Sequence, residues 1–98
     1  MIKFAFIVNE EDTADLKHPA EYESWIDYWS KNNDDKTPVR CANICCVRKD
    51  LVGAHVRKAT GRVMDTIPTY IIPLCNKCNK SKQWLLVYTD FILAPPAN

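Results

Sequence analysis

Five cysteines enclose one histidine between residues 41 and 78, and their spacing limits the folds that this chain can adopt. Cys41, Cys45 and Cys46 form a first cluster, and Cys75 and Cys78 form a second cluster about 30 residues further on. Thiolates from two short pairs can hold one Zn²⁺ tetrahedrally without a large apolar core. The Cys75-x-x-Cys78 spacing is too tight for an unstrained disulfide outside a redox motif. The sequence therefore predicts a zinc site that includes the second cluster.

The first cluster leaves two ligand pairs open, Cys41 with Cys45 or Cys41 with Cys46. Side chains of adjacent residues in an extended segment point apart, so one of the two neighbours binds the metal and the other stays a free thiol. We favour Cys41 and Cys46, because this pair leaves a roomier turn between the two ligands. An unpaired thiol suits the reducing cytoplasm and argues against a disulfide scaffold.

The length of 98 residues predicts one domain, residues 1–98, with a core too small to leave much stability in reserve. A structural Zn²⁺ would add its binding free energy to the free energy of folding. The apolar run at residues 2–8 is too short to cross a bilayer, lacks a signal-peptide cleavage site and is followed at once by acidic residues. We therefore expect a cytoplasmic protein with no membrane partner.

Charge is divided unevenly along the chain, although the net charge is +1. Residues 1–35 hold three lysines and nine carboxylates, whereas residues 36–98 hold ten Lys or Arg and three Asp. A basic segment around the cysteines is typical of contact with phosphate, and the alternative is that these are ordinary solvated charges. We predict that DNA contacts six residues of this segment: Arg57, Lys58, Arg62, Lys77, Lys80 and Lys82.

The acidic part, residues 1–35, is expected to form a strand and a helix. Alternation over residues 2–8 predicts a mostly buried strand. A helix is expected from Pro19 to about Asn32, because proline suits a first turn and acidic residues follow it. Large apolar side chains recur there at spacings of three and four, and this stripe is expected to pack on the first strand and the cysteine-rich segment: Tyr22, Trp25, Ile26 and Trp29.

The zinc-binding segment is expected to span residues 36–83. A short hairpin at residues 53–56 would carry His55, a loop would follow over residues 58–68, and a strand over residues 70–74 would deliver Cys75. A helix is expected from Cys75 to about Lys82, with both cysteines of the second cluster on its first turn. Residues 84–98 are expected to contribute strands at 84–88 and 91–93.

Residues 41–82 resemble the HNH endonuclease family, in particular its small bacterial and phage members. The resemblance rests on Gly-Ala-His55-Val and on Pro-Leu-Cys75-Asn-Lys-Cys78-Asn79. It implies an α+β fold with an HNH-like treble-clef zinc finger, which this chain would extend by an N-terminal strand and helix and by C-terminal strands. With the favoured first pair, one structural Zn²⁺ would be held by Cys41, Cys46, Cys75 and Cys78.

In this family the histidine of the first strand is the general base that activates water, and His55 occupies that position. Asn79 occupies the position of a ligand to a catalytic Mg²⁺ or Mn²⁺, which would stabilise charge at the cleaved phosphodiester. Two positions depart from the family pattern: Ala54 stands where a metal ligand is common, and Tyr70 where an asparagine braces the loop. His55 thus has three interpretations: general base, zinc ligand in place of a first-cluster cysteine, or structural histidine.

These features rank first a zinc-containing, HNH-like protein that binds DNA, with metal-dependent endonuclease or nickase activity as an open possibility. The alternative is a non-catalytic, zinc-stabilised protein-interaction module, such as a small phage-type inhibitor or accessory factor. In that alternative the acidic helix and exposed aromatic residues contact another protein. Enzymatic activity and oligomeric state both stay open at this point.

Overall fold

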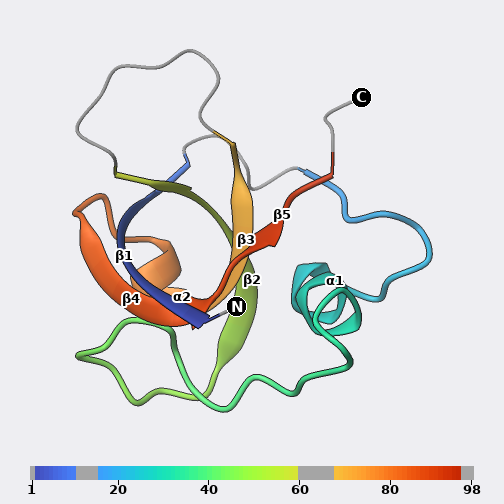
Figure 1. The fold of residues 1–98 in the computed structure, drawn as a ribbon, viewed down its shortest axis with the longest axis horizontal. Coiled ribbons are helices and arrows are strands. Elements are labelled where there is room, and N and C mark those ends of the chain that lie inside the picture. Colours follow the sequence, from blue (N-terminus) through green and yellow to red (C-terminus); the bar gives the residue numbers. More distant parts are fainter. Residues whose placement is uncertain (1, 11–15, 60–67, 96–98) are drawn as a thin grey trace.

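A computed structural model describes residues 2–10, 16–59 and 68–95 of the chain. These residues form an α+β fold with a five-stranded antiparallel sheet and two short helices (Figure 1). The elements follow in the order β1 (Ile2–Asn9), α1 (Trp25–Lys31), β2 (Leu51–Lys58), β3 (Tyr70–Cys75), α2 (Asn76–Asn79), β4 (Leu85–Asp90) and β5 (Ile92–Leu93). The predicted α+β class is confirmed.

The strands of the sheet lie in the order β4-β1-β2-β3-β5. β2 pairs with β3 from Leu51 opposite Cys75 to Val56 opposite Tyr70. β1 pairs with β2 on one side and with β4 on the other. The sheet is curved. α2 lies on its concave side, whereas α1 lies on the convex side of β2 and β3 (Figure 1).

Alternation along the strands places two apolar clusters on the two sides of the sheet. On the convex side, Tyr28 and Trp29 of α1 pack with Ile71 of β3. β3 is buried without a break from Ile71 to Cys75, because both clusters cover it. The concave side holds the larger cluster, which includes three cysteines: Ile7, Cys41, Ala42, Ala54, Val56, Ile72, Leu74, Cys75, Cys78 and Val87.

β1 confirms the predicted N-terminal strand and extends it by one residue, to Asn9. The predicted, mostly buried pattern of this strand is wrong for one face. Ile7 belongs to the concave cluster and is fully buried, but Phe4 and Phe6 on the opposite face are 66% and 52% exposed. The reason is the position of α1, which packs on β2 and β3 and leaves these two rings at the surface.

α1 begins later than predicted, at Trp25 rather than at Pro19. A turn occupies the predicted start, because the backbone N–H of Tyr22 donates to the carbonyl oxygen of Pro19 at 3.0 Å. Ser24 caps the helix instead: its hydroxyl accepts a hydrogen bond from the backbone N–H of Asp27 at 3.0 Å. α1 also packs on β2 and β3, which corrects the predicted contact with the first strand.

Two elements of the zinc-binding segment differ from the prediction. Residues 51–58 form the single strand β2, not a short hairpin at residues 53–56. α2 is one turn long and ends at Asn79, rather than reaching Lys82. Strands β3, β4 and β5 closely match the predicted strands. The predicted loop at residues 58–68 lies largely outside the described residues.

The outer edge of β4 is covered by the loop that carries the first cysteine cluster. The backbone N–H of Tyr88 donates to the carbonyl oxygen of Ala42 at 3.0 Å, and the N–H of Ile44 donates to that of Leu86 at 3.1 Å. These two backbone groups of the edge strand are therefore paired on the side that faces away from β1.

Candidate metal centre

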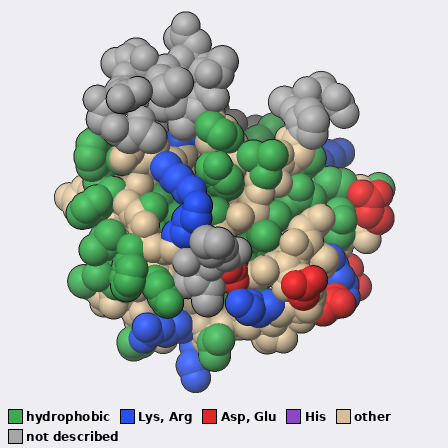
Figure 2. Space-filling view, viewed as in Figure 1, with side chains coloured by type: hydrophobic (Ala, Val, Ile, Leu, Met, Phe, Trp, Pro, Cys, Tyr) green, Lys and Arg blue, Asp and Glu red, His purple; other side chains and the backbone are tan. Residues whose placement is uncertain are grey.

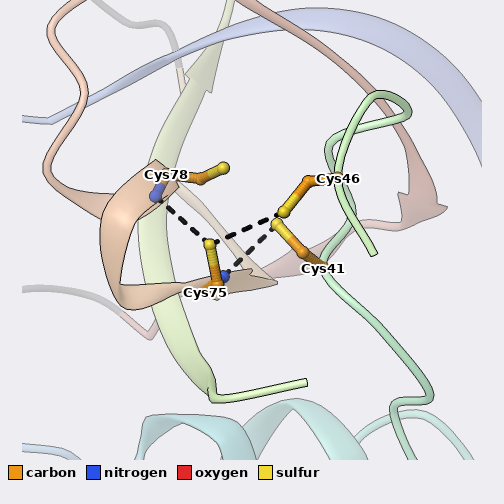
Figure 3. A group of neighbouring side chains, drawn as sticks. All are labelled: Cys41, Cys46, Cys75 and Cys78. Carbon is orange, nitrogen blue, oxygen red and sulfur yellow. Dashed lines mark hydrogen bonds between the residues drawn. The ribbon is translucent and has the colours of Figure 1, made fainter. Parts of the chain in front are cut away.

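Four cysteine side chains converge on the concave side of the sheet (Figure 3). The Sγ atoms of Cys41, Cys46, Cys75 and Cys78 all lie within 4.8 Å of one another, and those of Cys46 and Cys75 are 3.8 Å apart. A tetrahedral site with Zn–S bonds of about 2.3 Å requires sulfur atoms about 3.8 Å apart. The donor set and its spacing therefore fit a metal ion held by four thiolates.

β3 and α2 position the second cysteine pair. Cys75 ends β3 and is the N-cap residue of α2, so its Sγ accepts a hydrogen bond from the backbone N–H of Cys78 at 3.4 Å. The Nδ2 of Asn43 donates to the Sγ of Cys78, also at 3.4 Å. Such donors stabilise the negative charge that a metal-bound thiolate carries.

Backbone hydrogen bonds position the first cysteine pair. The N–H of Cys41 donates to the carbonyl oxygen of Arg48 at 2.9 Å, and the N–H of Cys46 donates to that of Asn43 at 3.0 Å. The two pairs are also linked directly, because the backbone N–H of Cys75 donates to the Sγ of Cys41 at 3.3 Å. The loop and the strand-helix junction thus meet at the four sulfur atoms.

Cys45 is exposed and does not belong to the cluster. It lies in the turn between Asn43 and Cys46, where its backbone N–H donates to the Oδ1 of Asn43 at 3.1 Å. Of the two pairs that the sequence leaves open, the structure therefore brings the favoured one, Cys41 with Cys46, to the second cluster. Cys45 keeps a thiol that solvent can reach.

Burial and hydrogen bonds together set the pKa values of the clustered thiols. Burial raises the pKa of the Cys41 thiol to about 12 and also raises the pKa of Cys78. Burial acts in the same direction at Cys75, but hydrogen bonds from Cys78 and from neighbouring thiols outweigh it there and lower the pKa. A metal ion must displace protons from the buried thiols, so its affinity rises with pH.

His55 faces the other side of the sheet from the cysteines. It is buried, and its ring meets the ring of Trp25 edge-on with centroids 4.5 Å apart. Its neighbour across the sheet, Ile71, belongs to the convex cluster. Burial lowers the pKa of His55, although the nearby carboxylate of Glu10 opposes this shift. Within the described residues His55 does not join the four sulfur atoms, so the geometry does not favour it as a zinc ligand.

Asn79 ends α2 on the concave side of the sheet. Asn9 of β1 holds α2 there, because its Nδ2 donates to the carbonyl oxygens of Cys78 at 2.9 Å and Ser81 at 3.0 Å. The sheet therefore lies between α2 and the ring of His55. The resemblance to HNH proteins implies that His55 and Asn79 act on one phosphodiester. The structure does not bring these two residues together.

Within the described residues, the two predicted DNA-binding residues of β2 point to opposite sides of the strand. Arg57 of β2 forms an ion pair with Glu10. Lys58 points to the opposite side of the strand, where its Nζ lies 4.8 Å and 4.6 Å from the ring centroids of Tyr70 and Phe91, and burial lowers its pKa. Three lysines are exposed in and after α2, and one arginine lies outside the described residues: Lys77, Lys80 and Lys82, and Arg62.

Sequence reasoning missed an exposed aromatic surface over β1 and β4, where Figure 2 shows hydrophobic side chains on the left of the view. Phe4 and Phe6 of β1, Tyr88 of β4 and Trp84 just before β4 are between 48% and 66% exposed, and we call these four residues the aromatic face. Phe4 lies opposite Tyr88, with ring centroids 4.3 Å apart. The alternation of β1 gives no signal for this exposure, because it places the large apolar Phe4, Phe6 and Val8 on one face and Lys3 on the other, a pattern that predicts burial of the phenylalanine face.

Comparisons of the chain with models of known protein families, with curated protein sequences and with solved structures find no match. Neither helix of the described residues has the length and apolar composition needed to cross a membrane. The functional conclusion must therefore come from the cysteine cluster, the positions of His55 and Asn79, and the aromatic face.

Proposed function

We propose that this chain is a non-catalytic, zinc-stabilised protein-interaction module. Its partner protein binds the aromatic face, and Zn²⁺ is held by Cys41, Cys46, Cys75 and Cys78. The observation that carries this proposal is the exposure of Phe4, Phe6 and Tyr88 on one face of two paired strands, with Trp84 exposed just before β4. Contiguous exposed apolar patches on monomeric proteins mark sites of interaction.

The donor set supports zinc over other metals. Four thiolates at tetrahedral spacing suit Zn²⁺, whereas Mg²⁺ and Ca²⁺ take oxygen ligands. Four protein ligands leave no position for water or substrate, which is the pattern of a structural rather than a catalytic site. The order of cysteine loop, β2–β3 pair and α2 supports the treble-clef interpretation. In a chain of this length, the binding free energy of zinc would contribute directly to folding.

The two cations of β2 give little support for a nucleic-acid partner at the aromatic face. Arg57 lies opposite Val8 of β1 and forms an ion pair with Glu10. Lys58 of the same strand is turned to the concave side, over Tyr70. Nucleic-acid affinity depends on cations that neutralise phosphates, and these two cations are already engaged within the chain. Aromatic side chains in this setting match the apolar centre of a protein interface.

The positions of His55 and Asn79 favour binding over cleavage. A general base must reach the water that attacks the phosphodiester, and the catalytic metal must contact the same phosphodiester. His55 meets Trp25 on the convex side, whereas Asn79 ends α2 on the concave side. One phosphodiester cannot contact both residues through the sheet.

A photo-cross-linking residue at position 6 tests the proposal. In cells that express the chain naturally, p-benzoyl-phenylalanine replaces Phe6 in one variant and Val39 in a control variant, since Val39 is 78% exposed and lies outside the aromatic face. We expect a discrete protein adduct from position 6 and none from position 39. Phe6→Ser should abolish binding of that purified protein, with zinc content and thermal midpoint unchanged. Nucleic-acid adducts alone, or equal adducts from both positions, would contradict the proposal.

Nucleic-acid binding is the second candidate function, and one observation favours it. Lys77, Lys80 and Lys82 are exposed in and after α2, where the resemblance to HNH proteins implies contact with phosphate. Support would come from salt-sensitive binding of DNA that is weakened when the three lysines are replaced by glutamine and is unchanged in Phe6→Ser. Nicking of supercoiled plasmid in Mg²⁺ or Mn²⁺ by the wild type, but not by His55→Ala, would restore the endonuclease hypothesis.

A further inference from the structure

A pocket of about 700 Å³ lies between β2, the segment before α1 and the residues that follow β5. Its walls are mostly apolar and come from segments far apart in the sequence: Leu16, Pro19, Trp25, Pro68, Leu93 and Ala94. A few polar side chains line it as well, among them His55 and Glu10. A mostly apolar pocket of this size with a small number of polar groups is the usual form of a small-molecule site.

His55 is the buried polar group of this pocket. Only 7% of the residue is exposed, and its ring contacts the ring of Trp25. Neither ring nitrogen of His55 has a hydrogen-bond partner among residues 2–10, 16–59 and 68–95. Because His55 lines the pocket, a molecule bound there can supply a hydrogen-bond partner for its ring.

Trp25 provides a fixed wall beside His55. The two rings are at 83° to each other, and the Nε1 of Trp25 donates to the carbonyl oxygen of Leu16 at 3.1 Å. This hydrogen bond sets the orientation of the indole. A fixed aromatic surface next to a polar group favours a ligand with a planar ring, because rings pack well on rings in stacked or edge-on geometry.

Lys17 lines the pocket as well, but the charges next to His55 itself favour a neutral polar group on the ligand. Burial lowers the pKa of His55 and so favours the uncharged imidazole, which offers one donor and one acceptor. The carboxylate of Glu10, which pairs with Arg57, lies close enough to oppose that shift. An anionic group placed against His55 would be repelled by this carboxylate.

We propose that this pocket binds a small, neutral, planar aromatic molecule that carries a hydroxyl or ring N–H group. The polar hydrogen of the molecule is donated to a ring nitrogen of His55, and its ring packs against Trp25. The inference is independent of the proposed protein-interaction function, because the pocket shares no residue with the aromatic face or the cysteine cluster.

Indole is the probe that tests this inference, and indene is its matched control, since indene has nearly the same shape and lacks the N–H. Zinc-loaded, isotope-labelled protein is titrated with each compound and followed by NMR. We expect saturable shifts of pocket residues such as Thr69 and tighter binding of indole than of indene. His55→Phe should weaken indole binding by about five- to tenfold, the value of one hydrogen bond, and leave indene binding unchanged.

A second control excludes adsorption to the aromatic face, because Phe6→Ser should bind indole as the wild type does. If the spectrum of His55→Phe shows that this variant does not fold, the affinities of the wild type for indole and indene still test whether the pocket recognises the N–H group. Equal affinities of the wild type for the two compounds, equal affinities of wild type and His55→Phe for indole, or no saturable shift in the pocket would each overturn the inference.

Discussion

Gly53 of β2 lies directly against the backbone of Trp25, so that a Cβ atom at Gly53 would be 2.4 Å from the carbonyl carbon of Trp25. Backbone atoms cannot move aside as the end of a flexible side chain can, and α1 would have to shift away from the sheet. We expect Gly53→Ala to lower the free energy of unfolding by about 2–3 kcal/mol, measured by urea unfolding. The control is Lys49→Ala at an exposed position, with an effect within about 0.5 kcal/mol. Equal stabilities of the two variants would contradict this close packing.

Two adjacent cysteines are expected to behave differently. Cys46→Ser should lower both the zinc content and the thermal midpoint, because it removes one of four converging donors. Cys45→Ser should change neither quantity, because Cys45 is exposed outside the cluster. Elemental analysis and thermal unfolding check both outcomes. The reverse pattern would make Cys45 the ligand, and a wild-type transition that a chelator leaves unchanged would argue against a structural metal.

Asp90 should stabilise the fold in a pH-dependent way. The Oδ2 of this buried carboxylate accepts hydrogen bonds from the Nζ of Lys36 at 2.7 Å and the Nδ2 of Asn33 at 3.0 Å. Burial acts to raise the pKa of Asp90, but these hydrogen bonds outweigh it and hold the pKa below the ordinary value of 3.8. Because the folded pKa is the lower one, the stabilisation is present at neutral pH and is lost as the pH falls below 3.8 through the folded pKa.

Lys36→Met tests this pH dependence. We expect the variant to be less stable than the wild type by roughly 1–2 kcal/mol at pH 7, and the difference to shrink at acid pH as Asp90 takes up a proton. Urea unfolding at a series of pH values measures it, and comparison with wild type at each pH cancels the effect of acid on the cysteine cluster. Lys31→Met is the control and should have a smaller effect, because Lys31 pairs with Asp35 at the surface. A difference independent of pH would rule out Asp90 as the cause.

Trp29→Phe tests a buried hydrogen bond between α1 and the end of β4. The Nε1 of Trp29 donates to the carbonyl oxygen of Asp90 at 3.0 Å. Phenylalanine keeps most of the ring packing but removes this donor, while the Oγ1 of Thr89 still donates to the same carbonyl oxygen at 3.3 Å, so we expect a cost of about 1 kcal/mol. Trp25→Phe removes a more exposed hydrogen bond, to Leu16, and should lower the thermal midpoint less. The reverse order of midpoints would contradict this assignment.

The strands could be predicted from the sequence because alternation and apolar runs are local signals. The start of α1 could not, because Pro19 and Ser24 are both ordinary start signals for a helix. In the structure α1 starts later, after a turn at Pro19 and where Trp25 closely contacts Gly53. Neither feature can be read from the local sequence pattern. The exposure of one face of β1 depends on the same packing, since it follows from where α1 lies on the sheet.

The cysteine cluster could be predicted because metal ligands impose their own spacing on a sequence. The separation of His55 from α2 could not, because it depends on the register of β2. Ala54 and Val56 occupy concave positions, so His55 between them must face the convex side. A shift of one residue would reverse this arrangement, and a short motif carries no information about register.

The loop that brings Cys41 and Cys46 to the cluster also pairs with the outer edge of β4 through Ala42 and Ile44. Release of a bound metal would free this loop and uncover the backbone donors and acceptors of β4. An unpaired edge strand beside exposed aromatic rings is a template on which other copies of the chain can add strands. A metal bound by the cysteine cluster would therefore protect the chain against aggregation, and metal depletion should produce self-association through β4.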